Sequence, residues 1–145
     1  MNNDIRPKYD LDRFIQYHKT DYETALTEIR QGRKTSHWIW FIFPQVQGLG
    51  HSAFSKYFGI EGIDHAKAFY GNSTLRAHLR EITEALLSLP TLEISEVMPM
   101  IDVMKLKSSM TLFDVVCPDD IFAKVLDKYF SGERDKLTLD ILYKH

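Results

Sequence analysis

The stretch SHWIWFIFPQ, residues 36–45, is the most unusual part of the sequence, and it continues through a glycine-containing segment to Gly50. His37 and Gln45 stand out in it because both are polar beside so much apolar surface. A slot with aromatic walls and a few polar groups is a common way to hold a ring-containing ligand. We expect His37 to act there as an acid, a base or a hydrogen-bond donor. The ligand-binding residues expected in this segment are Ser36, Trp38, Trp40 and Gln45.

The alternative for the same segment is a helix of the hydrophobic core that contains a hydrogen-bonded histidine. By residue propensity alone, residues 36–43 could also form a buried strand. A lone strand would leave backbone groups unpaired in the interior, which is costly. We therefore predict a short central helix that is apolar on all sides and ends at Pro44.

A second candidate segment runs from Asp102 to Thr111. Asp102, Lys105 and Ser109 follow one another at spacings of three and four, so they would share one face of a helix. A lysine beside a carboxylate is suited to anchor a phosphate or carboxylate, or to transfer protons with a shifted pKa. Ser108 and Ser109 would add hydroxyl donors. Alternatively, Asp102 caps the helix, Lys105 is its ion-pair partner, and the hydroxyls bond back to the preceding turn.

We hypothesise that Ser36–Gly50 and Asp102–Thr111 meet around one aromatic pocket that binds a small molecule. A nucleotide or an ADP-ribose-like ligand would suit these parts, and so would hydrolysis or transfer of a glycosidic or phosphoester bond. The catalytic residues would be His37, Asp102 and Lys105. The alternative is a non-enzymatic regulatory domain whose tryptophan-rich surface docks a protein, which requires the tryptophans to be exposed as a patch.

No cofactor or metal is expected. The six histidines show no ligand spacing of a known metal motif, and the single cysteine, Cys117, has no partner. Gly48 and Gly50 form only half of a dinucleotide fingerprint, without a preceding strand or a third glycine.

Helix start and stop signals recur along the chain, and no hairpin signal lies between alternating runs. The clearest helix is expected from Ser73 to Pro90, where leucines and an isoleucine recur every three or four residues. Near the N-terminus we expect two helices, one from Asp10 to His18 and one that begins at the capping box of Thr20 and Glu23. Further helices are predicted at about 53–58, 64–70 and 102–116, with a brief segment at 94–98. Another is expected to begin at Asp119 or Asp120 and to end at Gly132, and the last to begin at Asp135 with Leu139 and Leu142 on its inner face.

The pattern predicts an all-α fold of about seven or eight short helices, with residues 1–145 forming one globular domain. It also predicts a common core, because three separate segments show helical apolar spacing. The residues expected to be buried together are Leu79, Ile82, Leu86, Phe113, Val125 and Leu126.

The composition limits the classes of partner. Hydrophobic residues make up 44% and charged residues 26% of the 145 residues, and the net charge is −2, so no basic surface is expected to bind nucleic acid. The longest apolar run, Trp38 to Phe43, is far below the roughly 20 residues that span a bilayer. The lone cysteine and the polar N-terminus indicate no oxidising compartment. We expect a soluble cytoplasmic protein with no membrane partner. The sequence leaves the oligomeric state open and favours a monomer.

Several motifs resemble those of the bacterial domain-of-unknown-function 1810 family. They are SHWIWFIFPQ, then GLG and SxxSKYFGI at Ser52 to Ile60, then KLKSSMTLF at Lys105 to Phe113. The resemblance extends from Leu11 to Leu142 and implies a small all-α fold with no established activity and no catalytic residues to transfer. The name calpastatin is often attached to members. That inhibitor is disordered and repetitive, and this chain is neither.

Overall fold

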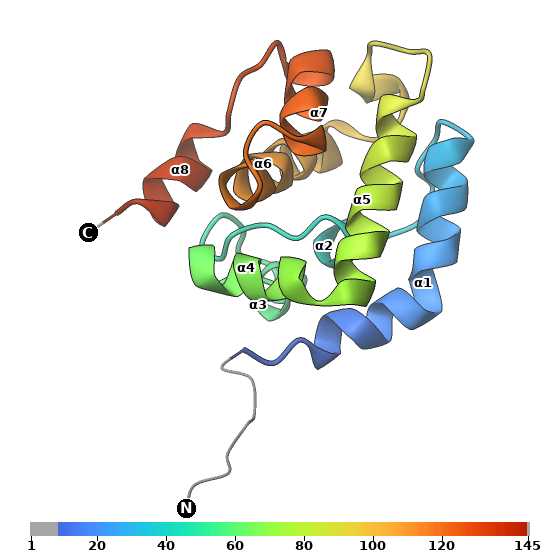
Figure 1. Cartoon of the computed structure of the whole chain (residues 1–145). Helices are drawn as coiled ribbons and strands as arrows, with labels where there is room; N and C mark the ends of the chain where they lie inside the picture. Colours follow the sequence, from blue (N-terminus) through green and yellow to red (C-terminus); the bar gives the residue numbers. More distant parts are fainter. Residues whose placement is uncertain (1–8, 145) are drawn as a thin grey trace, which may run out of the picture.

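Helices form the regular structure of residues 9–144, which are the residues that the computed structural model describes (Figure 1). Among them, the single bridge Val46–Ile60 is the only strand-like pairing. The all-α prediction and the predicted number of helices are therefore confirmed. The α-helices are α1 Asp12–Arg30, α2 Ile39–Ile42, α3 Ala53–Tyr57, α4 Ile63–Gly71, α5 Ser73–Leu87, α6 Met100–Val116, α7 Ile121–Phe130 and α8 Lys136–Leu142, with a 3₁₀ helix at Ile94–Glu96.

Helix α6 is the central element of the fold. It contacts α2, α4, α7 and α8, while α1 packs along α5 and α5 packs against α7 (Figure 1). A helix with neighbours on most sides must be apolar on most sides. This explains why α6 lacks the one-sided apolar stripe that α5 shows.

The helices share one hydrophobic core. The six residues predicted to be buried together all belong to it and are fully inaccessible to solvent, which confirms that prediction. The short helix α2 also lies in this core, with Ile39, Phe41 and Ile42 buried. The segment around the two tryptophans is thus helical and central, although α2 is shorter than the predicted 36–43.

The predicted break near Thr20 is wrong, because α1 continues from Asp12 to Arg30. The hydroxyl of Thr20 donates to the carbonyl oxygen of Tyr17 at 3.2 Å instead of accepting from the backbone of Glu23. Such back-bonding often bends a helix without ending it. Figure 1 shows that α1 changes direction near its middle.

Two helices begin at other cap residues than predicted. Asn72, not Ser73, caps α5, and its Oδ1 accepts from the backbone of Thr74 at 3.1 Å and of Leu75 at 3.0 Å. Pro99 occupies the cap position of α6, so Asp102 lies inside its first turn. In that place the Asp102 carboxylate is free to bind a side chain from elsewhere.

No helix of residues 9–144 is both long enough and apolar enough to cross a membrane.

Candidate functional site

An open groove of about 630 Å³ lies between the loop after α2 and the N-terminal half of α6. The start of α8 forms a further part of its wall. Thr111 links α8 to α6, because its hydroxyl accepts from the backbone N–H of Asp135 at 2.9 Å and donates to the carbonyl oxygen of Lys107 at 2.8 Å. The lining residues from α6 are Met100, Ile101, Met104, Lys105 and Ser108.

The floor of the groove is apolar and unusually exposed. Met100, Ile101 and Met104 are 62%, 67% and 61% exposed, and Leu137 of α8 is 64% exposed. Single exposed apolar side chains are ordinary, but a group of them along one hollow makes this groove a candidate binding surface.

The loop on the opposite side is held by a short parallel pairing. The backbone N–H of Gln47 donates to the carbonyl oxygen of Ile60 at 2.7 Å, and that of Ile60 donates to the carbonyl oxygen of Gln45 at 2.9 Å. Gly59 permits this approach, because a Cβ atom there would lie only 2.8 Å from Cβ of Gln47. The pairing positions Gln45 at the rim of the groove.

Three polar side chains of the groove have no partner among residues 9–144. Lys105 is half-buried and forms no hydrogen bond or ion pair there, and the side chains of Gln45 and His51 likewise form none. The groove therefore offers a cation, an amide and an imidazole beside an apolar floor. Ser108 differs, since its hydroxyl donates to the carbonyl oxygen of Met104 at 3.1 Å.

The structure brings together some of the predicted site residues. Gln45 and Gly50 from the first segment face Lys105 and Ser108 from the second across the groove. Trp40 lines a small neighbouring cavity. The two predicted segments thus meet around a hollow.

Ser36 and Trp38 lie elsewhere, in a buried polar network around Glu28. The Glu28 carboxylate accepts from the indole N–H of Trp38 at 3.0 Å, from the Ser36 hydroxyl at 2.5 Å and from the backbone of Thr35 at 2.8 Å. Burial raises the pKa of Glu28, but these hydrogen bonds outweigh it and hold that pKa at about 2. Trp38 is fully buried, so the idea that it stacks on a ligand or forms an exposed docking patch is wrong.

Asp102 belongs to the same buried region. Its Oδ2 lies 2.9 Å from Nζ of Lys34, and the two side chains are 12% and 4% exposed. Nζ of Lys34 also donates to the carbonyl oxygen of Ser36 at 2.5 Å and lies 4.9 Å from the ring centre of Trp38. The predicted pairing of Asp102 with Lys105 is therefore wrong, because Lys34 supplies the partner cation.

His37 and Ser109 are also outside the groove lining. His37 is exposed and forms no hydrogen bond or ion pair within the described part of the chain. The Ser109 side chain is fully buried, and its hydroxyl has no partner there. Since Asp102 is engaged by Lys34, the structure does not form the proton-transfer pair of His37 and Asp102 that the sequence suggested.

Sequence reasoning missed Lys34, His51 and the exposed residues Met100 and Ile101. For the last two the apolar side chains of α6 gave no signal, because a central helix is expected to be apolar on most sides. No local signal identifies Lys34, since its partner comes from a distant helix.

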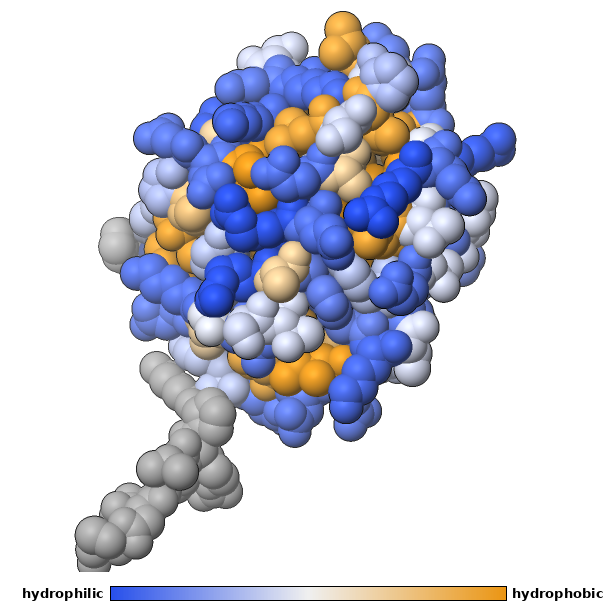
Figure 2. Space-filling view, turned by 45° about the vertical axis from the view of Figure 1, so that its right-hand side comes forward, coloured by the Kyte–Doolittle hydropathy of each residue, from blue (hydrophilic) through white to orange (hydrophobic). Residues whose placement is uncertain are grey.

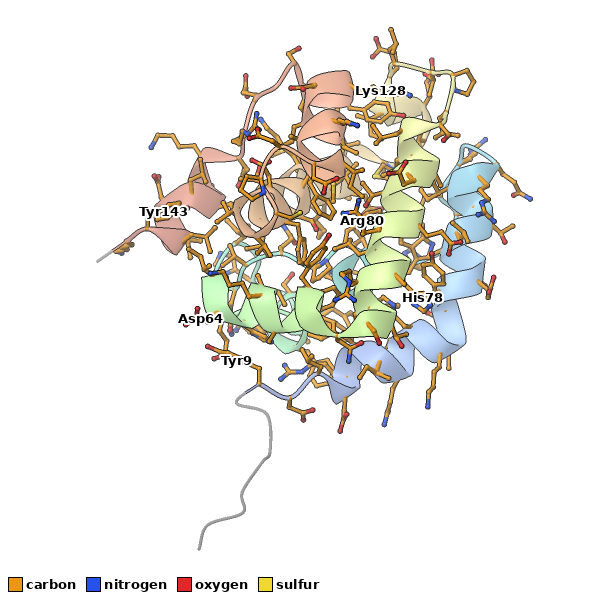
Figure 3. The ribbon with its side chains drawn as sticks, viewed as in Figure 1. Tyr9, Asp64, His78, Arg80, Lys128 and Tyr143 are labelled. Carbon is orange, nitrogen blue, oxygen red and sulfur yellow. The ribbon has the colours of Figure 1, made fainter. Side chains whose placement is uncertain are left out.

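A second polar cluster joins α1 to α5. Nε2 of His18 lies 2.8 Å from the carbonyl oxygen of Phe41, so it must donate, and Nδ1 of His18 then accepts from Nδ1 of His78 at 2.9 Å. Burial lowers the pKa of His18 to about 4, against the opposing hydrogen bond to Phe41. In Figure 3, His78 lies between α5 and α1. The pair acts as a neutral bridge between helices.

Arg80, on the other side of α5 (Figure 3), joins this helix to the start of α7. Its guanidinium group binds both carboxylate oxygens of Asp120 at 3.2 Å and donates to the hydroxyl of Tyr70 at 2.7 Å. The hydrogen bond from Arg80 is the main reason that the pKa of Asp120 falls to about 2. Cys117 lies 3.3 Å from the same carboxylate. Among the described residues, Arg80 thus has a carboxylate partner, unlike Lys105 of the groove.

Another hollow, of about 510 Å³, lies beside α1 and the end of α5. Figure 2 shows this side of the molecule, on which hydrophilic side chains predominate and hydrophobic ones form smaller patches. Arg30 and Glu81 line the hollow and pair with each other at 3.7 Å. Arg30 therefore has an ion-pair partner, whereas Lys105 of the groove has none among the described residues. For this reason the groove is the better candidate site.

By its fold, this chain is a small all-α protein, and an open groove lies beside its central helix α6. The family described as protein of unknown function (DUF1810) matches residues 8–142, and the chain belongs to this family. It is also similar to the conserved hypothetical protein Rv1873 from Mycobacterium tuberculosis, whose crystal structure gives a TM-score of 0.92. The two sequences are 34% identical, over 96% of this chain and 100% of that chain. No curated protein matches significantly.

Proposed function

We propose that the protein binds a small anionic molecule with a flat or apolar body, such as a nucleotide or an ADP-ribose-like compound, in the groove beside α6. The observation that carries the proposal is Lys105, a half-buried cation without an ion-pair partner among the described residues. A phosphate or carboxylate group would provide that partner. Gln45 and His51 would bind further polar atoms of the ligand.

The apolar floor suits the body of such a ligand. Met100 and Met104 are flexible and polarizable, and methionine sulfur interacts favourably with aromatic rings. A planar ring laid on these two side chains would also cover Ile101, which is otherwise largely exposed.

The groove supports binding more strongly than catalysis. Asp102, one of the predicted catalytic residues, is engaged by Lys34, and His37 is absent from the lining. Within the groove, His51 is the residue best suited to transfer a proton near neutral pH. A hydrolase or transferase reaction would therefore depend on His51 in place of His37.

The test is a titration followed by calorimetry and thermal unfolding, with AMP, ADP-ribose and inorganic phosphate as probes. A ligand at one hundred times its dissociation constant should add about 2.7 kcal/mol of stability, which corresponds to a rise in Tm of roughly 5–10 °C. Lys105→Met should weaken binding by about 10- to 100-fold, because a hydrogen bond to a charged group is lost.

Lys124→Met is the matched control. Lys124 is exposed on α7 and lies outside the groove lining, so the same loss of charge there should leave affinity unchanged. Equal affinities of the Lys105→Met variant and the native protein, or no binding of any probe, would contradict the proposal.

The exposed apolar residues also favour a second candidate, the docking of a protein segment on the groove. Ile101→Lys should abolish the association with such a partner. For a small molecule held mainly by Lys105, the same change should alter affinity far less.

A further inference from the structure

A small cavity adjoins the groove, with about 10 Å³ of space for the centre of a water-sized atom. Gln45, Gly50 and Ser55 line both hollows, so the cavity begins where the loop side of the groove ends. Trp40, Val46 and Phe58 complete its wall.

The indole nitrogen of Trp40 is a buried donor without an acceptor among residues 9–144. An indole N–H can only donate, and leaving a buried donor unpaired is unfavourable. Trp38 shows the usual solution, because its indole N–H donates to the Glu28 carboxylate at 3.0 Å. The Trp40 N–H, by contrast, belongs to a residue that borders a cavity of atomic size.

The position of Trp40 is well determined by its neighbours. Its ring stacks on Phe54 of α3 at 4.8 Å, with 26° between the planes. Ser55, also on α3, lies so close to Gly50 that a Cβ atom at Gly50 would overlap the Ser55 hydroxyl oxygen. The side of the cavity shared with the groove is therefore built from a glycine, a hydroxyl and an amide.

We propose that the Trp40 N–H, together with Gln45 and Ser55, forms a subsite of the groove that binds a carbonyl oxygen of the ligand. The indole N–H donates the hydrogen bond and the ligand oxygen accepts it. The inference rests on the proposed function and adds a specificity to it. The cavity is small enough to take an exocyclic oxygen atom while the ring that carries it stays in the groove. Among purine nucleotides, a base with a carbonyl group at position 6 fits this subsite. An amino group at position 6 does not, because it and the indole N–H are both hydrogen-bond donors.

IMP and AMP differ at this position and are the probes for the test. The chain contains two tryptophans, so uniformly ¹⁵N-labelled protein gives two indole N–H signals, and Trp40→Phe assigns them. IMP should shift the Trp40 signal and leave the Trp38 signal in place. IMP should also bind about tenfold more tightly than AMP, because only IMP satisfies the donor. In Trp40→Phe the two affinities should become equal.

The outcomes separate the two proposals. The carbonyl subsite is refuted if binding depends on Lys105 but leaves the Trp40 signal unmoved. It is also refuted if the native protein binds IMP and AMP with equal affinity. Either result leaves the proposed function standing. If IMP, AMP, ADP-ribose and phosphate all fail to bind in the calorimetric titration, the proposed function is wrong and the subsite is wrong with it. The shifts and the ratio of the IMP and AMP affinities are measured on the native chain, and Trp40→Phe serves to assign the two signals.

Discussion

Replacing Asp102 with asparagine would leave the ammonium group of Lys34 without the carboxylate that lies 2.9 Å away. The Lys34 side chain is 4% exposed, so water does not replace the lost partner. Removing one member of a buried ion pair typically costs 3–5 kcal/mol. Lys34 keeps its hydrogen bond to the carbonyl oxygen of Ser36 and its contact with the Trp38 ring, which places the expected loss near the lower end, at about 3 kcal/mol.

The assay is urea unfolding followed by far-ultraviolet circular dichroism, with the free energy of unfolding extrapolated linearly to water. A loss of this size corresponds to a fall in Tm of roughly 6–12 °C. Asp140→Asn is the control, because Asp140 and its partner Lys136 are 56% and 87% exposed and their pair should contribute about 0.5 kcal/mol or less.

A double variant, Lys34→Met with Asp102→Leu, tests the cause. Replacing a buried ion pair by apolar side chains is often neutral, so this variant should recover most of the stability that Asp102→Asn loses. If Asp102→Asn is as silent as Asp140→Asn, the reasoning from burial and distance is refuted.

Two further predictions concern stability. His18 is neutral in the folded protein with a pKa of about 4, against 6.5 in the unfolded chain, so stability should fall by about 3 kcal/mol as the pH falls from about 6.5 to 4. Urea unfolding at several pH values should show that His18→Asn loses less of its free energy of unfolding at low pH than the native protein does. Identical pH profiles of the two proteins would contradict a neutral, buried His18 in the bridge to His78. Gly59→Ala should cost about 1–3 kcal/mol, because its Cβ would meet Gln47 at 2.8 Å, while Gly62→Ala, which meets nothing within 4 Å, should change the thermal midpoint little.

The helices and their shared core could be predicted because the signals are local. Gly32 adopts a positive φ of 81° directly after α1, and Pro90 follows α5, as their types predict. The error at Thr20 has a physical cause as well. A capping motif has only a modest energy, and a helix that is held by its packing against α5 and α2 continues through it.

The candidate site was predicted only in part. Gln45, Lys105 and Ser108 were expected to share a site, and they line one groove. His37 and Asp102 could not be placed correctly, because helical spacing identifies possible neighbours only three or four positions away.

The sequence by itself determined most of the helical segments, six residues of their common core and the two stretches that carry unusual polar residues. Tertiary structure alone decided which of those polar residues are engaged and which are free. Asp102 is bound by Lys34, from the loop after α1, and Trp38 by Glu28 of α1, while Lys105 retains no partner within the described residues. The reason is that propensity and capping act over a few residues, whereas a buried charge is satisfied by whichever opposite group the packing of distant helices brings within hydrogen-bonding distance.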